Sequence, residues 1–170
     1  MTSLAEIAPP FIATAHRIVW ATLATVDTHG RPRSRILHPI WEWDGDDLVG
    51  WIGTGPTPVK TAHIEANPFV SVNYWDPHQD IVTAECRATF LHDDDSCTRV
   101  WDLLENAPAP VGYDPASIPF WTEPTAPTFA ALRLDPWRLR VFPGSVLLEG
   151  RGDVLDWTGA VDPDPRPESR

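Results

Sequence analysis

Short runs in which apolar and polar residues alternate, bounded by turn residues, recur along most of this chain. Such a period of two is typical of strands with one buried face. The pattern predicts six strands, the last of which is either single or a pair interrupted at Asp135-Pro136: Val19–Val26, Arg33–Trp43, Leu48–Ile52, Phe69–Trp75, Ile81–Leu91, and Phe129–Leu134 with Leu139–Phe142. Turn residues join the first three, which are therefore expected to form an antiparallel meander. The spacing of all six indicates a small barrel.

Three short helices are predicted between the strands. The first lies within Leu4–Trp20, and Pro9 and Pro10 are expected near its start because proline suits a first helical turn. The second is Pro58–Ala66, which again has a proline in its first turn. The third, Ser96–Glu105, follows three aspartates whose negative charge favours the N-terminal end of a helix.

Two segments lack a regular pattern. Asn106–Thr128 is rich in proline and aromatic residues, so we predict an ordered loop that packs on the barrel or on a partner subunit. From Gly150 onward the chain is polar and rich in proline, which predicts a mobile tail. The expected organisation is one domain over residues 1–149, followed by a C-terminal tail over residues 150–170.

The composition excludes several functional classes. The formal net charge of the 170 residues is -11, which argues against nucleic-acid binding because such binding relies on clustered Lys and Arg. No apolar stretch is long enough to span a bilayer, and Met1–Pro10 lacks the features of a secretory signal. Cys86 and Cys97 do not make a disulfide framework, and the histidines show no metal-ligand spacing. We therefore expect a cytoplasmic protein that binds neither a membrane nor a metal.

A locally basic corner stands out against this acidic background. Arg35 lies in a predicted strand, and Thr54 lies in the small-residue loop G-T-G-P-T-P. Lys60, the only lysine in the chain, lies in the first turn of the next helix. The start of a helix offers free N–H groups and a partial positive charge. Arg35, Thr54 and Lys60 are therefore expected to converge on one small anion.

The order of these residues resembles a known family. G-R-P-R-S-R-I from Gly30, then Thr54, then K-T-A-H-I-E-A-N-P-F-V-S-V from Lys60 look like the FMN-binding split barrel of the pyridoxamine 5'-phosphate oxidase family. The resemblance covers Val19–Leu91, with a weaker echo at Pro136–Gly144. It implies a mainly β fold with short helices, built as a six-stranded antiparallel split β-barrel. It also implies a homodimer with FMN at the interface, in which hydride passes through flavin N5 to or from a small-molecule substrate.

The same resemblance implies which residues hold the cofactor. Arg35, Thr54 and Lys60 would bind the flavin phosphate, because Arg offers a bidentate contact, Lys a point charge and Thr a hydroxyl. The strand that begins at Arg35 would lie along the flavin ring and supply backbone hydrogen bonds. The full set of expected cofactor-binding residues is Arg35, Ile36, Leu37, His38, Thr54, Val59 and Lys60. No catalytic acid or base is assigned, because the flavin carries the redox chemistry.

Two departures from the family argue against vitamin B6 oxidation. The oxidases carry a lysine late in the second strand, where this chain has Ile40, and an Arg-x-His pair after the last strand, where it has Ser145–Glu149. In that family these groups hold pyridoxal phosphate. The expected substrate is therefore something other than pyridoxamine phosphate. The alternatives are a reductase of the same fold that uses a deazaflavin coenzyme, and a non-catalytic flavin- or haem-binding protein.

Several residues near the basic corner have two interpretations. Arg31 and Arg33 share one face of a strand and form either a solvated surface or a contact for the longer anionic tail of a deazaflavin coenzyme. His38 either touches the flavin or substrate or is a hydrogen-bonded structural histidine. His63, one helical turn beyond the lysine, either assists the phosphate or faces solvent.

Most of the nine tryptophans are expected to fill the core. Trp75 and Trp121 each lie near a loop and are better candidates for a wall of the substrate site. The Trp137-Arg138 pair, part of the weaker C-terminal echo of the family, is a candidate contact for the flavin of the partner subunit.

Overall fold

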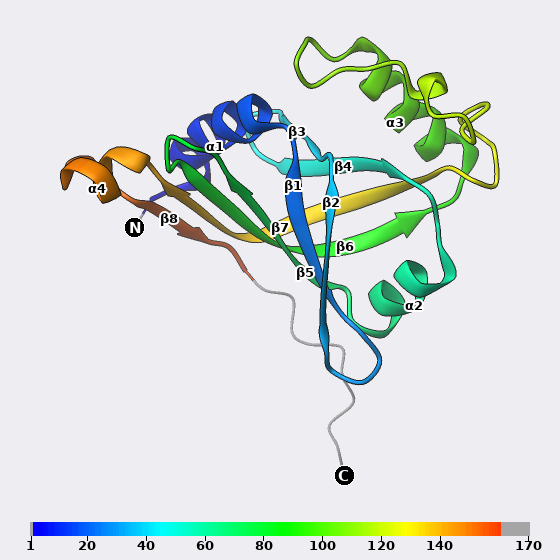
Figure 1. Ribbon diagram of the computed structural model, residues 1–170, viewed down its shortest axis with the longest axis horizontal. Helices are drawn as coiled ribbons and strands as arrows, with labels where there is room; N and C mark the ends of the chain where they lie inside the picture. Colours follow the sequence, from blue (N-terminus) through cyan, green and yellow to red (C-terminus); the bar gives the residue numbers. More distant parts are fainter. Residues whose placement is uncertain (1, 161–170) are drawn as a thin grey trace.

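The computed structural model describes residues 2–160, which form eight antiparallel strands in a single sheet (Figure 1). In chain order the elements are α1 (Leu4–Ile18), β1 (Ala21–Val26), β2 (Pro32–Leu37), β3 (Ile40–Trp43), β4 (Leu48–Thr54), α2 (Pro58–Ala66), β5 (Phe69–Trp75), β6 (Ile81–Leu91), α3 (Asp94–Asn106), the 3₁₀ helix η1 (Pro115–Ser117), β7 (Ala130–Phe142), α4 (Gly144–Glu149) and β8 (Leu155–Thr158). The strand order is β2-β1-β5-β6-β7-β4-β3, and β8 pairs with β7. The predicted mainly β fold with short helices is confirmed, although the strands exceed the expected six.

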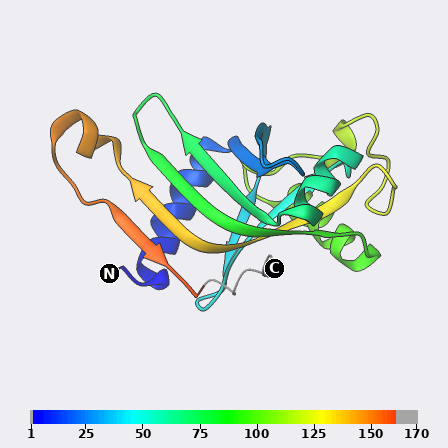
Figure 2. The ribbon, with the colours of Figure 1, turned by 90° about the horizontal axis from the view of Figure 1, so that it is seen from below.

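The sheet is strongly curved, and α1 packs across β3, β5, β6, β7 and β8 (Figure 2). Ile7, Ala8, Phe11 and Ala15 form the buried face of α1 and join the inward side chains of the strands in the main core. The ring of Phe11 meets that of Trp41 edge-on, with centroids 5.0 Å apart. The helix therefore supplies the apolar side chains that fill the curved sheet.

The first helix begins earlier than its prolines suggest. The Ser3 side chain accepts a hydrogen bond from the Glu6 backbone N–H, and the Glu6 carboxylate accepts one from the Ser3 backbone, which makes a capping box. Pro9 and Pro10 lie inside α1, so their expected place at the helix start is wrong. Apolar residues at helical spacing on the buried face outweigh the cost of about 3 kcal/mol for an interior proline. Within residues 2–160, no helix has the length and apolar character needed to cross a membrane.

The second predicted strand is divided at His38-Pro39 into β2 and β3. Proline has no N–H to donate to a strand ladder, so the chain leaves one ladder at this point and joins another. β2 pairs with β1, whereas β3 pairs with β4, and β4 pairs with β7. The expected three-stranded meander is therefore wrong, because β2 and β3 lie at opposite ends of the strand order.

The last predicted strand pair is one continuous strand, β7. A register shift where β6 passes from Glu85 to Cys86 leaves Trp137 without a partner on β6, and this bulge lies next to Pro136. The first half of β7 pairs with β4 and the second half with β8. β8 thus stands where a mobile tail was expected. Residues 161–170 of that tail lie outside the described residues, and the domain boundary at residue 149 stays a prediction.

A second buried cluster joins α3 to the segment that connects α3 to β7. Trp121 of this segment packs edge-on against Phe129, with ring centroids 4.9 Å apart, and the ring of Trp101 of α3 lies 5.4 Å from the same phenylalanine. The proline-rich segment is therefore ordered and packs on its own subunit. Trp121 is buried in this cluster, which removes it as a candidate for the wall of a substrate site.

Candidate functional site

Two elements of the fold bring Lys60 and Thr54 together. β4 ends at Thr54, and after a short loop Pro58 begins α2, with Lys60 in its first turn. The Lys60 ammonium donates hydrogen bonds to Thr54 Oγ1 at 2.5 Å and to the carbonyl oxygen of Gly55 at 2.9 Å. The lysine therefore folds back over the end of β4 instead of extending into solvent.

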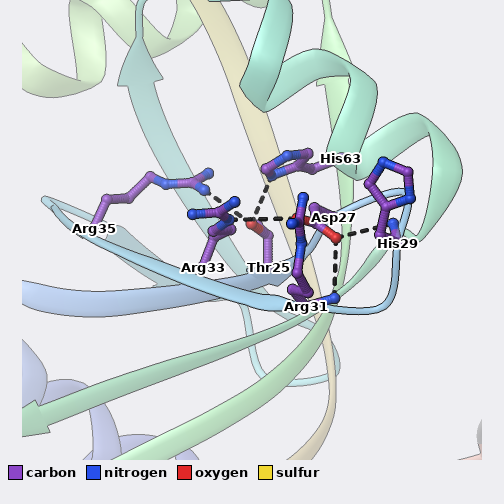
Figure 3. A network of polar contacts seen from close by, with 7 residues as sticks. All are labelled: Thr25, Asp27, His29, Arg31, Arg33, Arg35 and His63. Atoms are coloured by element: carbon purple, nitrogen blue, oxygen red, sulfur yellow. Dashed lines mark hydrogen bonds and ion pairs between the residues drawn. The ribbon is translucent and has the colours of Figure 1, made fainter.

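Arg35 of β2 completes a cationic group with this lysine. Arg35 Nη2 donates to Thr25 Oγ1 on β1 at 2.9 Å, and the same hydroxyl lies 3.3 Å from Nδ1 of His63 on α2 (Figure 3). Arg35 Nη1 is buried and has no hydrogen-bond partner. A buried, unpaired guanidinium nitrogen is costly, so this donor lacks an acceptor that a ligand would supply.

Burial and mutual repulsion act on both cations. Burial, with a further contribution from the charge of Arg35, lowers the pKa of Lys60 to about 8. Burial also lowers the pKa of Arg35. Among residues 2–160, neither side chain forms an ion pair with a carboxylate. Two neighbouring cations without a counter-ion favour binding of an anion.

Arg31 and Arg33 differ from Arg35 because they already have an acidic partner. Nε of Arg31 and Nε of Arg33 lie 2.8 and 3.4 Å from Oδ2 of Asp27, and the backbone N–H groups of His29 and Arg31 donate to Oδ1 of the same carboxylate (Figure 3). These hydrogen bonds, the one from the Arg31 backbone first, lower the pKa of Asp27. Both arginines are exposed, as expected of a solvated face, and they also form an ion-pair cluster at the turn of the β1–β2 hairpin.

Two of the three apolar residues of the predicted set, each next in sequence to one of the cations, are mostly exposed. Ile36 follows Arg35 in β2 and is 60% exposed, and Val59 precedes Lys60 in α2 and is 65% exposed. Leu37, by contrast, packs against the main core. Large apolar side chains this exposed are candidates for a covered surface, either by a ligand or by another subunit.

His38 lies beyond Leu37, where β2 ends, and is 7% exposed. Its ring stacks on Tyr113 at a centroid distance of 5.4 Å and lies 5.3 Å from the exposed ring of Trp20. Neither ring nitrogen has a hydrogen-bond partner among the described residues, so the hydrogen bond expected of a structural histidine is absent. Contact of His38 with the flavin or substrate stays a prediction. Burial, with a smaller contribution from His16, lowers the pKa of His38 to about 4.

The structure therefore brings part of the predicted set into one place. Arg35, Thr54 and Lys60 gather at the cationic group, whereas His38 lies three residues beyond Arg35, just after the end of β2. Sequence reasoning missed Thr25, because a single threonine in an apolar strand carries no signal of its own. His63 was considered for its position one turn after Lys60, and it is buried near Thr25 instead of facing solvent.

Trp137 of the predicted Trp137-Arg138 pair lines a groove that Thr25 of β1 also lines. The Trp137 indole lines an apolar groove of about 210 Å³ with Phe69 and Pro32, and its Nε1 is buried without a partner. Arg138 donates to the Glu85 carboxylate at 3.1 Å. The arginine is therefore neutralised within its own subunit.

The cationic group consists of hydrogen-bond donors and hydroxyls, which fits a phosphate or a carboxylate. In residues 2–160, no cluster of three or more His, Cys, Asp or Glu side chains is arranged to hold a metal ion. The site can therefore bind and orient an anionic group.

Comparison with known proteins relates the chain to one protein family. Residues 13–143 match the family model of pyridoxamine 5'-phosphate oxidase. A pyridoxamine 5'-phosphate oxidase-related, FMN-binding protein from Nostoc punctiforme PCC 73102 has a similar structure, with a TM-score of 0.63 and 19% identity over 95% of this chain and 100% of that one. No curated protein sequence matches the chain.

Two further solved structures share the fold but carry other names. A haem-binding protein from Mycobacterium smegmatis has a TM-score of 0.61 and 19% identity over 94% of this chain and 59% of that one. An F420 reductase has a TM-score of 0.51 and 16% identity over 75% of this chain and 93% of that one. At such identities the likenesses show the split-barrel fold alone.

Proposed function

Because the chain belongs to the pyridoxamine 5'-phosphate oxidase family, we propose that its cationic site binds the phosphate of FMN and that the protein is a flavin-dependent oxidoreductase. The observation that carries this proposal is the pair of buried cations, Arg35 and Lys60, together with the unpaired Nη1 of Arg35. A phosphate monoester supplies the negative charge and the acceptor oxygens that these groups lack. The residues present therefore fit the cofactor.

Each residue has a distinct part in holding the cofactor. Arg35 offers the unpaired guanidinium nitrogen, Lys60 a charge that is free of any carboxylate, and Thr54 a hydroxyl at the end of β4. β2 is the first strand in the sheet order, so one side of its backbone makes no strand pairing and is free to form hydrogen bonds along the flavin ring. When bound, FMN supplies the redox chemistry through hydride transfer at N5.

A homodimer with the cofactor at its interface is part of this proposal. Ile36 and Val59, sequence neighbours of the two cations, expose most of their surface, and β2 is an edge strand. A second copy of the chain placed over this edge would remove both apolar side chains from water. Sedimentation of the purified protein tests the dimer, and a monomer that binds FMN fully would separate cofactor binding from assembly.

The arginines at the hairpin turn favour FMN over a deazaflavin coenzyme. The longer anionic tail of that coenzyme would need further basic groups, and Arg31 and Arg33 are already paired with Asp27. Tight binding of the deazaflavin coenzyme without affinity for FMN would decide against this ranking.

The proposed substrate is a small molecule other than pyridoxamine phosphate. Ile40 stands where the oxidases carry a substrate-binding lysine, and it is buried in the second cluster against α3. Ser145–Glu149, which stands where those enzymes carry an Arg-x-His pair, lies in α4. Neither segment therefore offers a basic group for a substrate phosphate. We also propose a reducing, cytoplasmic location, which agrees with two free and buried cysteines, Cys86 and Cys97.

The absorbance spectrum of the purified protein, before and after addition of FMN and then dithionite, tests the function. We expect a flavin spectrum that survives gel filtration and bleaches on reduction. Colourless protein that takes up no FMN would contradict the proposal, and a Soret band would point to a haem-binding protein instead. Bound flavin that no reductant and electron acceptor turn over would indicate a non-catalytic binder.

A further inference from the structure

Two residues that the family resemblance does not assign, Thr25 and His63, contact the guanidinium side of the site. We propose that they are positioning residues for the phosphate: the Thr25 hydroxyl, itself held by His63, fixes the Arg35 guanidinium so that Nη1 is left for the ligand. This inference rests on the proposed function, because it concerns the same anion site.

The register of the sheet explains how Arg35 reaches this hydroxyl. Thr25 on β1 is directly opposite Arg33 on β2, and Arg35 is opposite Leu23. Thr25 and Arg35 are therefore diagonal neighbours, a separation that a long side chain can span. Nη2 of Arg35 reaches Thr25 Oγ1 at 2.9 Å, whereas Arg33 turns to Asp27 (Figure 3).

The hydroxyl and the histidine are both withdrawn from solvent. Thr25 is 1% exposed and His63 is 7% exposed, and Oγ1 of Thr25 lies 3.3 Å from His63 Nδ1. A guanidinium only donates hydrogen bonds, so Oγ1 must accept from Arg35, and its own hydrogen is free for Nδ1 of His63. In this assignment the Thr25 hydroxyl accepts a hydrogen bond from Arg35 and donates one to His63. The hydroxyl thereby links β2, β1 and α2.

The contacts of Thr25 and His63 hold Arg35 near Lys60 against the repulsion between the two cations. Arg35 and Lys60 carry the same charge, and Arg35 contributes to the lowered pKa of Lys60. Without a tether, the flexible arginine on an edge strand would move toward solvent and away from the lysine. The buried hydroxyl holds it in place before the ligand arrives, so the ordering cost does not reduce the binding free energy.

The test compares affinities for FMN and for riboflavin, which lacks the phosphate, in matched variants. Thr25→Val keeps the shape of the side chain but removes the hydroxyl, and Thr25→Ser keeps the hydroxyl. Thr22→Val, at an exposed position of the same strand, is the control. We expect Thr25→Val to weaken FMN binding about tenfold and leave riboflavin binding unchanged, with Thr25→Ser and Thr22→Val near wild type.

A second readout separates positioning from packing. A looser Arg35 relieves the repulsion on Lys60, so the pH at which FMN affinity begins to fall should rise in Thr25→Val and not in Thr22→Val. If Thr25→Val does not fold, His63→Leu replaces it, with loss of FMN affinity in the same direction.

Three results would overturn the inference. Folded Thr25→Val with wild-type FMN affinity would remove the hydroxyl from the phosphate site and leave the proposed function intact. Equal loss of FMN and riboflavin binding would assign Thr25 to packing alone. A wild-type protein that binds no FMN would overturn the proposed function and this inference together.

Discussion

The Lys60 ammonium lies 2.5 Å from the hydroxyl of Thr54, and among residues 2–160 it forms no ion pair with a carboxylate. A lysine that is partly buried against a hydroxyl and a carbonyl oxygen has two of its three N–H donors hydrogen-bonded, and its charge remains uncompensated. The arrangement stabilises the side chain in place while leaving its charge for a ligand.

Lys60→Ala should weaken FMN binding without unfolding the protein. Loss of one charge-assisted phosphate contact costs about 1.5–3 kcal/mol, or roughly ten- to a hundredfold in affinity. Titration of FMN fluorescence measures the affinity, and the thermal midpoint of the apoprotein checks the fold. Wild-type affinity in a folded Lys60→Ala protein would remove this lysine from the site.

FMN affinity should fall at alkaline pH because Lys60 must be charged to bind phosphate. Its pKa in the free protein is about 8, and a bound dianion would raise that value. The affinity for FMN is therefore highest below about pH 8 and declines above it. The decline is at most about tenfold per pH unit, over the range in which Lys60 is neutral in the free protein but still charged in the complex. Lys60→Arg, which stays charged, should give a nearly flat profile over this range. The same decline in Lys60→Arg would assign it to another group.

Acidification should destabilise the protein through His38. The pKa of this histidine is about 4 in the folded protein, against about 6.5 in an unfolded chain, so the unfolded state binds more protons between these values. Its contribution to the free energy of unfolding is fully present above about pH 6.5 and is lost as pH falls toward 4, by about 3 kcal/mol.

Urea unfolding at several pH values, compared with His38→Phe, isolates this contribution. Phenylalanine keeps an aromatic ring against Trp20 and Tyr113 but does not titrate. The difference in stability between wild type and variant should change between pH 7 and pH 4.5. A constant difference would show that His38 is not protonated on unfolding in this range.

The buried hydrogen bond between Trp41 and Tyr74 should matter for stability and not for the cofactor. The indole Nε1 of Trp41 donates to the Tyr74 hydroxyl at 2.9 Å in the main core. Tyr74→Phe leaves that indole unsatisfied, which should lower the free energy of unfolding by about 1–3 kcal/mol. Tyr113→Phe is the control, and chemical denaturation provides the measurement. Equal effects of the two substitutions would contradict a special role for this bond.

The local parts of the fold and site were predictable from sequence. Period-two patterns placed β5 and β6 over the residues that form them, and the proline at its first turn placed α2. Lys60 and Thr54 are six residues apart, so the loop that joins a strand to a helix fixes their contact locally. Arg35 was predicted to lie in the same site because the order of Arg35, Thr54 and Lys60 along the chain resembles that of a known family.

Features that depend on distant pairing were not predictable. The residues of β4 and its neighbours in sequence do not indicate that β4 pairs with β7 instead of β2. The pairing depends on which arrangement of strands buries the apolar face of the sheet. Thr25 becomes part of the site only through its diagonal relation to Arg35 across two strands. β8 was missed because four residues in a polar segment gain strand structure only from pairing with β7.

Lys60 is the only lysine of the chain, and this gives the site a chemical consequence. Because its pKa is lowered to about 8, a larger share of its amine is neutral and nucleophilic near pH 7 than in an exposed lysine. Acylating reagents therefore meet a single side-chain amine in this protein. One acetyl group would remove the ammonium charge and leave the anion site with the charge of Arg35, and protection from acetylation would report occupancy at a single, known atom.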